Sequence, residues 1–291
     1  MLAELHSLVW ATSVETLPLD RVIVRKDDYL LVRSPSNPAH HWGNLLVFDR
    51  PPGAGDARRW EQLFELEFGE DPRVRHKTFA WDRIDGEVGL AHDEFVPRGY
   101  DLDESIGLVA ERRQIRAHRR ENRDVLIRAL DPAPGANEEL WQAVVELQVA
   151  GRDEHHDEAG YRDFVRARLD GLREHFRTGR GAWYVAVEPT HGDVAASCGV
   201  VVAGERGRFQ AVDTAVAYRR RGICSRLVVE VAQRSAASHQ TERFVIVADA
   251  GYHALGLYES LGFSRREHVF GVCRRPDAEG TASRPGSRLE G

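Results

Sequence analysis

The stretch "AYRRRGICSRL" (217–227) sets three arginines and a glycine directly before an apolar pattern. The pattern has the spacing of one helical face, so it predicts a helix that begins near Gly222. Its members are Ile223, Leu227, Val228 and Val231. The segment 208–216 is short, apolar and β-branched, which indicates a buried strand before the helix. Because such a turn directs free main-chain N–H groups and the positive end of a helix dipole at one point, it predicts the binding of a phosphate or another anion.

Two features of this loop favour the phosphate interpretation. Gly222 lets the main chain approach a ligand closely, and Arg219, Arg220 and Arg221 add positive charge. The loop does not end in the G-K-[ST] of a Walker motif, and no G-x-G-x-x-G follows a strand, so neither nucleotide motif applies. The alternative is a loop whose arginines are only solvated surface.

A second stretch of sequence favours the phosphate-binding interpretation over a loop of solvated arginines. After "RFVIVAD" (243–249), which has the composition of a strand, "AGYHALGLYESLGF" (250–263) places apolar residues on one helical face. Together the two stretches resemble the GNAT (Gcn5-related N-acetyltransferase) superfamily. Its pyrophosphate loop, [RQ]-x-x-G-x-[GA], is matched by Arg219 and Gly222 but not at Cys224. Its closing signature, A-x-x-L-Y-x-x-L-G-F, is matched by Ala254, Leu257, Tyr258, Leu261, Gly262 and Phe263.

The preceding elements follow the order of the same family. We expect strands at 124–130, 182–188, 193–204 and 208–216, and a last strand at 266–274. We expect helices at 137–151, with Asn137 as N-cap, and at 161–176. The resemblance spans about residues 124–275 and implies an α/β fold (an α+β mixed sheet), mostly antiparallel and twisted, with helices on both faces.

An internal echo indicates that this fold occurs twice. The segment 94–111 aligns with 257–274 at an offset of 163, and a strand, a helix and a strand are expected before it at 43–50, 56–68 and 76–82. We therefore predict two GNAT-like domains in tandem. The predicted parts are a degenerate, non-catalytic domain at 1–110, a basic linker at 111–123, a catalytic domain at 124–275 and a disordered tail at 276–291. Chance similarity of two apolar segments is the alternative.

The first copy lacks the residues on which the chemistry depends. In place of the phosphate loop it has "DRPPGAGD" (49–56), where Pro51 and Pro52 remove two main-chain donors. Tyr258 falls on Phe95, which has no hydroxyl group. We expect acyl-CoA to bind the second copy only.

The resemblance also implies how acetyl-CoA is held. The strand before the phosphate loop splays from its neighbour, and the exposed main-chain groups of Thr214, Ala215 and Val216 would hold the pantetheine arm. The pyrophosphate would lie on the amides from Arg220 to Ser225. The residues between these two are Arg221, Gly222, Ile223 and Cys224.

Tyr258 is implied to be the general acid. A phenol with a pKa of about 10 can protonate a thiolate and remains protonated itself at neutral pH. Since Tyr258 shares a helical face with Leu257 and Leu261, the alternative is a core aromatic residue.

The general base is less defined. Many members carry a glutamate eleven residues before the loop, but that position here is Arg208. The candidates are Asp213 on the same strand, and His155 or His156 in the loop between the first two helices, which lines the acceptor pocket in the family. Alternatively, Asp213 bonds only the backbone and the histidines are solvated. The acidic and histidine-rich loop lacks helical spacing, so we expect no metal.

Two further positions depart from the family pattern. Cys224 stands where relatives have Gly or Ala, and a thiol at a helix start can be acidified and therefore oxidised. We favour simple packing of a small side chain over this redox role. Gly251 stands where many relatives have asparagine, which removes one contact near the pantetheine.

The composition agrees with a soluble cytoplasmic enzyme. The chain is 42% hydrophobic without a run of eighteen apolar residues, and its start lacks the pattern of a signal peptide. Three cysteines of irregular spacing indicate a reducing compartment. The net charge of −6 argues against a general nucleic-acid binder, although the basic run 111–122 could face RNA or an acidic partner if it is not a solvated linker.

We therefore predict an acetyl-CoA-dependent N-acetyltransferase that modifies a small-molecule or peptide amine, with no nucleic-acid or membrane partner, as a monomer or homodimer. The alternative is a catalytically weak acyl-CoA-binding regulatory module. The identity of the amine is not encoded in any motif.

Overall fold

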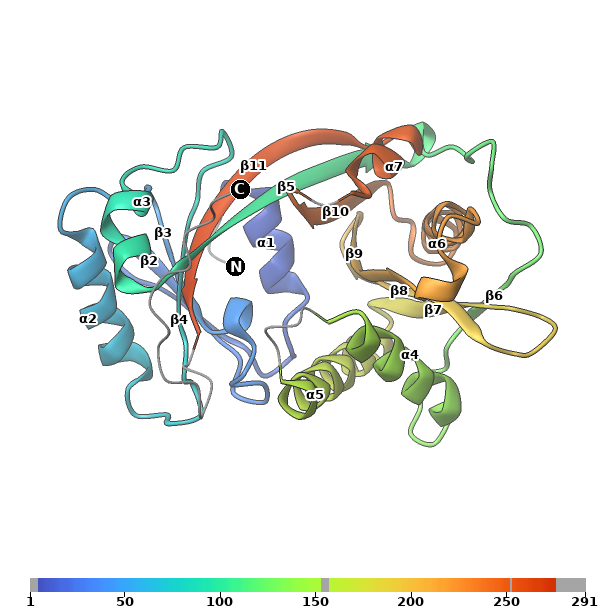
Figure 1. Ribbon diagram of the computed structural model, residues 1–291, viewed down its shortest axis with the longest axis horizontal. Coiled ribbons are helices and arrows are strands. Elements are labelled where there is room, and N and C mark those ends of the chain that lie inside the picture. The colour runs from blue at the N-terminus through green and yellow to red at the C-terminus, as the bar shows by residue number, and fades with distance from the viewer. Residues whose placement is uncertain (1–4, 153–156, 252, 276–291) are drawn as a thin grey trace, which may run out of the picture.

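The computed structural model describes residues 5–152, 157–251 and 253–275, which form one continuous mixed sheet flanked by helices (Figure 1). The helices are α1 (Leu8–Glu15), α2 (Asp56–Phe68), α3 (Ala91–Glu94), α4 (Glu138–Ala150), α5 (Glu158–Arg177), α6 (Ile223–His239) and α7 (Leu255–Ser260). The strands are β1 (Val22–Arg25), β2 (Tyr29–Arg33), β3 (Leu45–Phe48), β4 (Lys77–Trp81), β5 (Asp101–Glu111), β6 (Leu126–Ala129), β7 (Gly181–Val187), β8 (Val194–Ala203), β9 (Arg206–Thr214), β10 (Arg243–Asp249) and β11 (Ser264–Arg274).

The eleven strands follow the order β1-β2-β3-β4-β11-β5-β10-β9-β8-β7-β6. All ladders between these strands are antiparallel except β3 with β4 and β9 with β10. Each of the two parallel pairs is joined by a helix, α2 or α6, as a parallel connection requires. Two similar halves thus share a single sheet.

The halves exchange their last strands. β11 lies between β4 and β5, and β5 lies between β11 and β10, so each half completes the sheet of the other. Figure 1 shows these two long strands side by side across the middle of the molecule. They begin and end 163 residues apart, and each follows a glycine with positive φ, Gly99 at 82° and Gly262 at 105°. The internal echo is therefore a structural repeat, as predicted.

Helices cover both faces of each half. In the second half, α6 and α7 pack on one face and α4 and α5 on the other. In the first half, α2 and α3 pack on one face and α1 on the other. Phe95 and Tyr258, which the repeat superimposes, are 0% and 2% exposed.

Most predicted elements are confirmed, and several ends shift. Helix 56–68 and strand 243–249 have the predicted bounds, whereas the helix expected over 250–263 is only Leu255–Ser260. Asn137 occupies the N-cap of α4, but its side chain accepts from Asp131 N instead of capping the helix. The predicted tail 276–291 lies outside the described residues, and the domain boundaries remain a prediction.

The basic segment 111–123 differs from a free linker. Its side chains are largely exposed, but its main chain is held against the second half by three hydrogen bonds. These run from Arg112 N to Glu242 O (2.7 Å), from Arg116 N to Leu261 O (3.0 Å) and from Asn122 N to Gly222 O (3.1 Å). The segment therefore forms part of the surface beside α6 and α7.

Candidate functional site

An opening between β9 and β10 is the main feature of the second half. The two strands pair at three positions only, ending with Val245 and Arg208, although both continue beyond that point. Ala211 has a φ of 40°, and β9 shifts its register against β8 at this place. Such a bulge bends a strand away from its neighbour. Main-chain groups on the β10 side of β9 are thereby released from the sheet after Arg208.

The opening leads to the arginine-rich loop. Arg220 and Gly222 have left-handed φ values of 61° and 74°, and α6 begins at the next residue. Left-handed residues before a helix turn successive N–H groups toward one point, which forms an anion-binding concavity. The first N–H groups of α6, from Ile223 to Ser225, have no acceptor within the helix. The loop thus has the backbone geometry for a phosphate.

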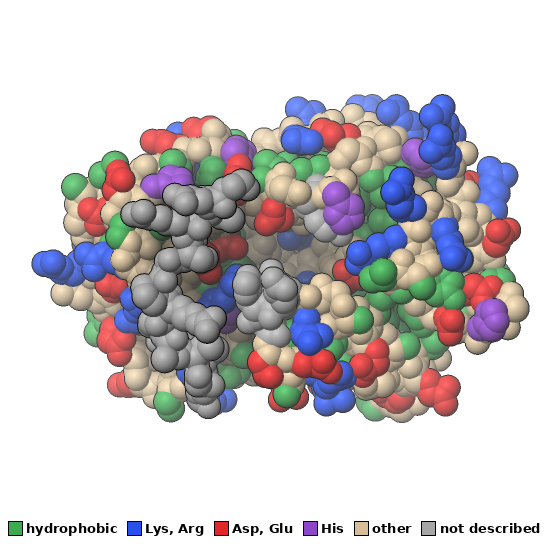
Figure 2. All heavy atoms as spheres, viewed as in Figure 1, with side chains coloured by type: hydrophobic (Ala, Val, Ile, Leu, Met, Phe, Trp, Pro, Cys, Tyr) green, Lys and Arg blue, Asp and Glu red, His purple; other side chains and the backbone are tan. Residues whose placement is uncertain are grey.

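Only glycine fits at position 222. A Cβ atom there would lie 1.9 Å from the carbonyl oxygen of Arg120 and 3.0 Å from Asn122 N. The basic segment therefore packs against the loop and fixes its shape. Figure 2 shows Lys and Arg side chains gathered over this end of the molecule, above α7 and the start of α6. The local charge favours a polyanionic ligand.

The side chains of the loop make local contacts that leave its arginines exposed. Arg219 Nε donates to Thr214 O (3.2 Å), the Arg221 guanidinium lies over the Tyr218 ring at 5.3 Å, and Ser225 Oγ donates to Gly222 O (2.9 Å). Their charged ends remain accessible to a ligand.

The structure alters one expectation about the pantetheine contacts. Ala215 N donates to Ala195 O (2.9 Å), and Ala215 O accepts from Tyr218 N (2.8 Å), so both main-chain groups of Ala215 are already used. Val216 lies in a short 3₁₀ turn with its side chain exposed, and Thr214 still pairs with β8. The released edge of β9 instead precedes Thr214, nearer the bulge.

The structure favours packing over an acidic thiol at Cys224. Burial raises the pKa of Cys224 to about 12, and a nearby Asp213 acts in the same direction. These effects exceed the lowering by a hydrogen bond to Thr214. Cys224 is a packing residue whose thiol is protonated at neutral pH.

The acid and base candidates fall in different environments. Tyr258 is buried in the core between α6, α7 and the sheet, with its ring 6.4 Å from that of Phe263. Burial raises the pKa of Asp213, while Arg168 and Arg219 act against this shift. His155 and His156 lie outside the described residues. Within the described ranges, no group of three or more potential metal ligands occurs.

The corresponding place in the first half is closed. β3 and β4 pair to their ends at Phe48 and Trp81, and Asp82 N continues the ladder to Phe48 O (2.8 Å). The Trp60 ring stacks on Phe48 at 3.8 Å and fills the space beneath. Over residues 5–110, the first half therefore has no opening of this kind.

Carboxylates already occupy the start of α2. Asp56 accepts from Gly53 N (2.7 Å) and from Arg50 Nη1 (2.7 Å), and Glu94 accepts from Gly55 N (2.9 Å). A phosphate at this helix start would meet two negative side chains. This agrees with a first half that does not bind acyl-CoA.

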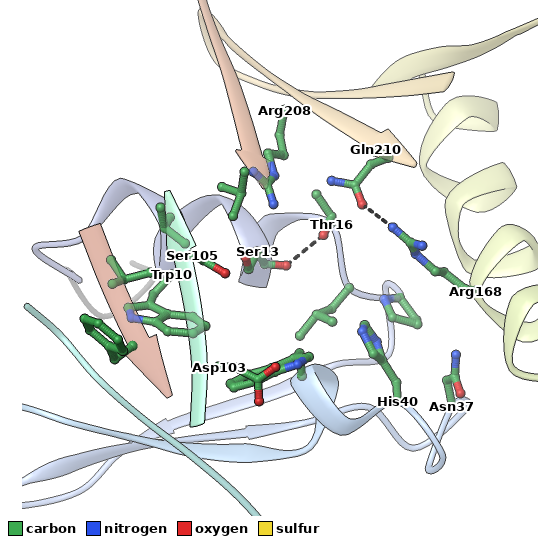
Figure 3. A pocket seen from close by; sticks show the side chains of 17 residues that line it. Trp10, Ser13, Thr16, Asn37, His40, Asp103, Ser105, Arg168, Arg208 and Gln210 are labelled. Atoms are coloured by element: carbon green, nitrogen blue, oxygen red, sulfur yellow. Dashed lines mark hydrogen bonds between the residues drawn. The ribbon is translucent and has the colours of Figure 1, made fainter. Parts of the chain in front are cut away.

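A cavity of about 210 Å³ lies between the halves (Figure 3). It is walled by α1, α5, β5, β9, β10, β11 and the segment 37–42. On β9, Arg208 and Gln210 line it, whereas Phe209 between them packs with α6 and α7, so the cavity is on the opposite face of the sheet from α6. Its charged or titratable side chains are His40, Asp103, Arg168 and Arg208.

Sequence reasoning placed part of the acceptor pocket at the junction of the two halves but did not identify the residues that line this cavity. The sequence singled out Arg208 only because it replaces a glutamate expected from the family. No sequence pattern indicated a role for Arg168 or Asp103. Burial raises the pKa of Asp103 to about 6 and lowers that of His40 to about 3. His40 is therefore neutral at physiological pH.

Comparisons with solved structures give the fold. A conserved protein of unknown function from Staphylococcus epidermidis matches with a TM-score of 0.68 and 13% identity, over 89% of this chain and 95% of that one. A GCN5-related N-acetyltransferase from Kribbella flavida matches with a TM-score of 0.58 and 14% identity, over 96% and 94%. These likenesses show the fold, which this chain shares with a GCN5-related N-acetyltransferase.

Two further comparisons agree with this fold. A tandem GNAT protein from the clavulanic acid biosynthesis pathway matches this chain with a TM-score of 0.53 and 12% identity, over 93% of this chain and 88% of that one. The family model described as FR47-like protein matches residues 190–271, which contain β9, the loop and α6. No curated protein matches the sequence. Among the described helices of this chain, none is long and apolar enough to span a bilayer.

Proposed function

We propose that this protein is a member of the GNAT superfamily that transfers the acetyl group of acetyl-CoA to a primary amine, and that only its second half does so. The opening between β9 and β10, which leads to the loop at Arg220–Ser225, carries this proposal. The separated strands leave main-chain groups with which an extended arm could pair, and the loop has donors and positive charge for a diphosphate. The fold shared with a GCN5-related N-acetyltransferase and with a tandem GNAT protein supports the choice of acetyl-CoA.

The groups of the site would have the following roles in acetyl transfer. Acetyl-CoA supplies the acetyl group as a thioester. The released N–H groups on β9 would donate to the carbonyl oxygen as it becomes an oxyanion, which stabilises the tetrahedral intermediate. The amine nitrogen forms the new bond to the carbonyl carbon, and the carbon–sulfur bond breaks. A general acid then protonates the thiolate, and a base accepts the proton of the amine.

We propose Tyr258 as the acid and Asp213 as a base. Tyr258 lies on the α6 face of the sheet, and its burial excludes water from a proton transfer. The raised pKa of Asp213 makes this carboxylate a better proton acceptor than an exposed one. His155 and His156 remain alternative bases in the proposal.

Isothermal titration of acetyl-CoA, followed by thiol release with a panel of amines, tests the proposal. We expect one acetyl-CoA per chain and amine-dependent release of CoA. Binding without release for any amine would favour the regulatory module instead. The absence of both acetyl-CoA binding and CoA release would refute the proposed function.

A triple variant with alanine at Arg219, Arg220 and Arg221 tests the location of the site. The matched control replaces Arg58 and Arg59 at the start of α2, where a helix also begins after a left-handed glycine. We expect weaker acetyl-CoA binding in the triple variant and unchanged binding in the control, because phosphate contacts depend on local charge. Equal affinities in both variants would contradict the assignment of the loop.

A further inference from the structure

Among the described residues, Arg208 has no charge partner in the cavity. Its Nε and Nη1 atoms are inaccessible to solvent and have no hydrogen-bond partner. No described acidic side chain lies within ion-pair distance of its guanidinium, and Asp103 is at the opposite side of the cavity in Figure 3. Burial, with a contribution from the nearby Arg168, lowers the pKa of Arg208 to about 9. A buried guanidinium without hydrogen bonds is unfavourable, and an anion would relieve this cost.

The described neighbours of Arg208 do not supply that anion. Arg168 Nη2 donates to Gln210 Oε1 (2.9 Å), and Gln210 Nε2 donates to Phe209 O (3.0 Å), so Gln210 is held in place by both contacts. Arg168 is already stabilised by the charge of Asp213, whereas Arg208 is not. One end of the cavity thus carries two guanidinium groups and an excess of positive charge.

The position of Arg208 relates this charge to the reaction. Arg208 is the last residue of β9 that pairs with β10, so its side chain projects from the point at which the two strands separate. It projects to the face opposite α6, toward the cavity. An acceptor in this cavity would lie on the other side of the opening from the phosphate loop.

The remaining walls limit the size and character of the occupant. The volume of about 210 Å³ is smaller than the 300–1,000 Å³ typical of sites for drug-sized ligands. Trp10 and Trp42, stacked at 5.6 Å between ring centroids, form an apolar side of the cavity. The space therefore suits a small molecule with one anionic end.

We propose that the acceptor is a small amine that bears a carboxylate, such as an amino acid, and that Arg208 binds this carboxylate. The proposal rests on the proposed function and adds the substrate class. Arg168 contributes a second positive charge, and the amine extends from the carboxylate toward the opening between β9 and β10. A guanidinium takes the position where other members of the superfamily are expected to have a glutamate base.

Matched substrates test the proposal. Amino acids and the corresponding amino-acid amides are compared as acceptors with acetyl-CoA as donor, and as ligands by isothermal titration. We expect at least one amino acid to be acetylated with a kcat/KM about 10-fold or more above that of its amide. Succinyl-CoA as donor is included, because a preference for it would assign Arg208 to the acyl chain and overturn the proposal.

Variants at Arg208 separate the carboxylate contact from folding. Arg208→Met should lower kcat/KM for the preferred amino acid about 10- to 100-fold through KM, and Arg208→Lys should restore part of it. The control, Arg243→Met, removes an exposed arginine on the adjacent strand and should change nothing. Acetyl-CoA affinity should stay constant in all three variants.

A failure of this inference can be distinguished from a failure of the proposed function. Transfer to amines without a preference for the carboxylate, or an equal effect of Arg208→Met on amino acids and amides, overturns this inference and leaves the proposed function intact. Loss of acetyl-CoA binding in the wild type refutes the proposed function, and titration of the amino acids alone then decides the inference. Saturable binding that Arg208→Met weakens supports it, and no binding of any amino acid overturns it.

Discussion

Replacement of two equivalent glycines by alanine provides a controlled test of the loop geometry. Gly222 and Gly55 both precede a helix with left-handed φ values, 74° and 81°. A left-handed alanine costs about 1–2 kcal/mol of stability at either position. The two sites differ in their surroundings, since nothing lies within 4 Å of a Cβ at Gly55, whereas one at Gly222 would lie 1.9 Å from Arg120 O.

This contact sets the expected magnitude. The overlap at Gly222→Ala involves main-chain atoms that must shift, which adds about 1–3 kcal/mol as overpacking does. We expect Gly55→Ala to lose about 1–2 kcal/mol in the free energy of unfolding and Gly222→Ala to lose about 2–5 kcal/mol. Because the displaced segment also shapes the loop, acetyl-CoA affinity should fall about 10-fold or more in Gly222→Ala only.

Urea denaturation and isothermal titration measure both quantities on the same preparations. The reasoning is refuted if the two variants lose the same stability, or if Gly55→Ala weakens acetyl-CoA binding as much as Gly222→Ala does. A Gly222→Ala variant with full affinity would also show that the contact with the basic segment is irrelevant to the ligand.

Three further outcomes follow from the site. Tyr258→Phe should lower turnover about 10²–10⁴-fold with nearly unchanged acetyl-CoA affinity, as stopped-flow and titration data would reveal, and unaltered turnover would return Tyr258 to a packing role. Asp103 has a folded pKa near 6, above its unfolded value, so its ionisation destabilises the fold. Asp103→Asn should therefore gain up to about 2 kcal/mol relative to wild type between pH 4 and pH 7, and a pH-independent difference would contradict the burial of this charge. Because the Cys224 thiol stays protonated, peroxide should inhibit wild type and Cys224→Ala equally, whereas protection by the variant would restore the redox hypothesis.

The sequence predicts those parts of the fold that depend on local periodicity. Helix α2 and strand β10 have clear apolar patterns and appear with the expected bounds. The internal echo likewise predicted the repeat, because β5 and β11 follow equivalent glycines. The exchange of these strands could not be predicted from the sequence. Each half would bury the same apolar residues with its own last strand or with that of the other half, and tertiary packing decides between the two arrangements.

In the candidate site, too, local features were predicted from the sequence and tertiary contacts were not. The loop at Gly222 was predicted from residue types alone, and its left-handed conformation agrees with that prediction. Its contact with Arg120 is a tertiary feature that no local pattern encodes. Arg208 appeared in the sequence only as an unexpected replacement, because its burial and lack of partners depend on α1, α5 and the exchanged strands.

A crystal structure of the full chain with CoA tests the central claim most directly. We predict one CoA per chain, with its diphosphate on the N–H groups of Arg220 to Ser225 and its pantetheine arm between β9 and β10. A diphosphate at the start of α2, or a CoA molecule that does not enter the opening between β9 and β10, would contradict the account.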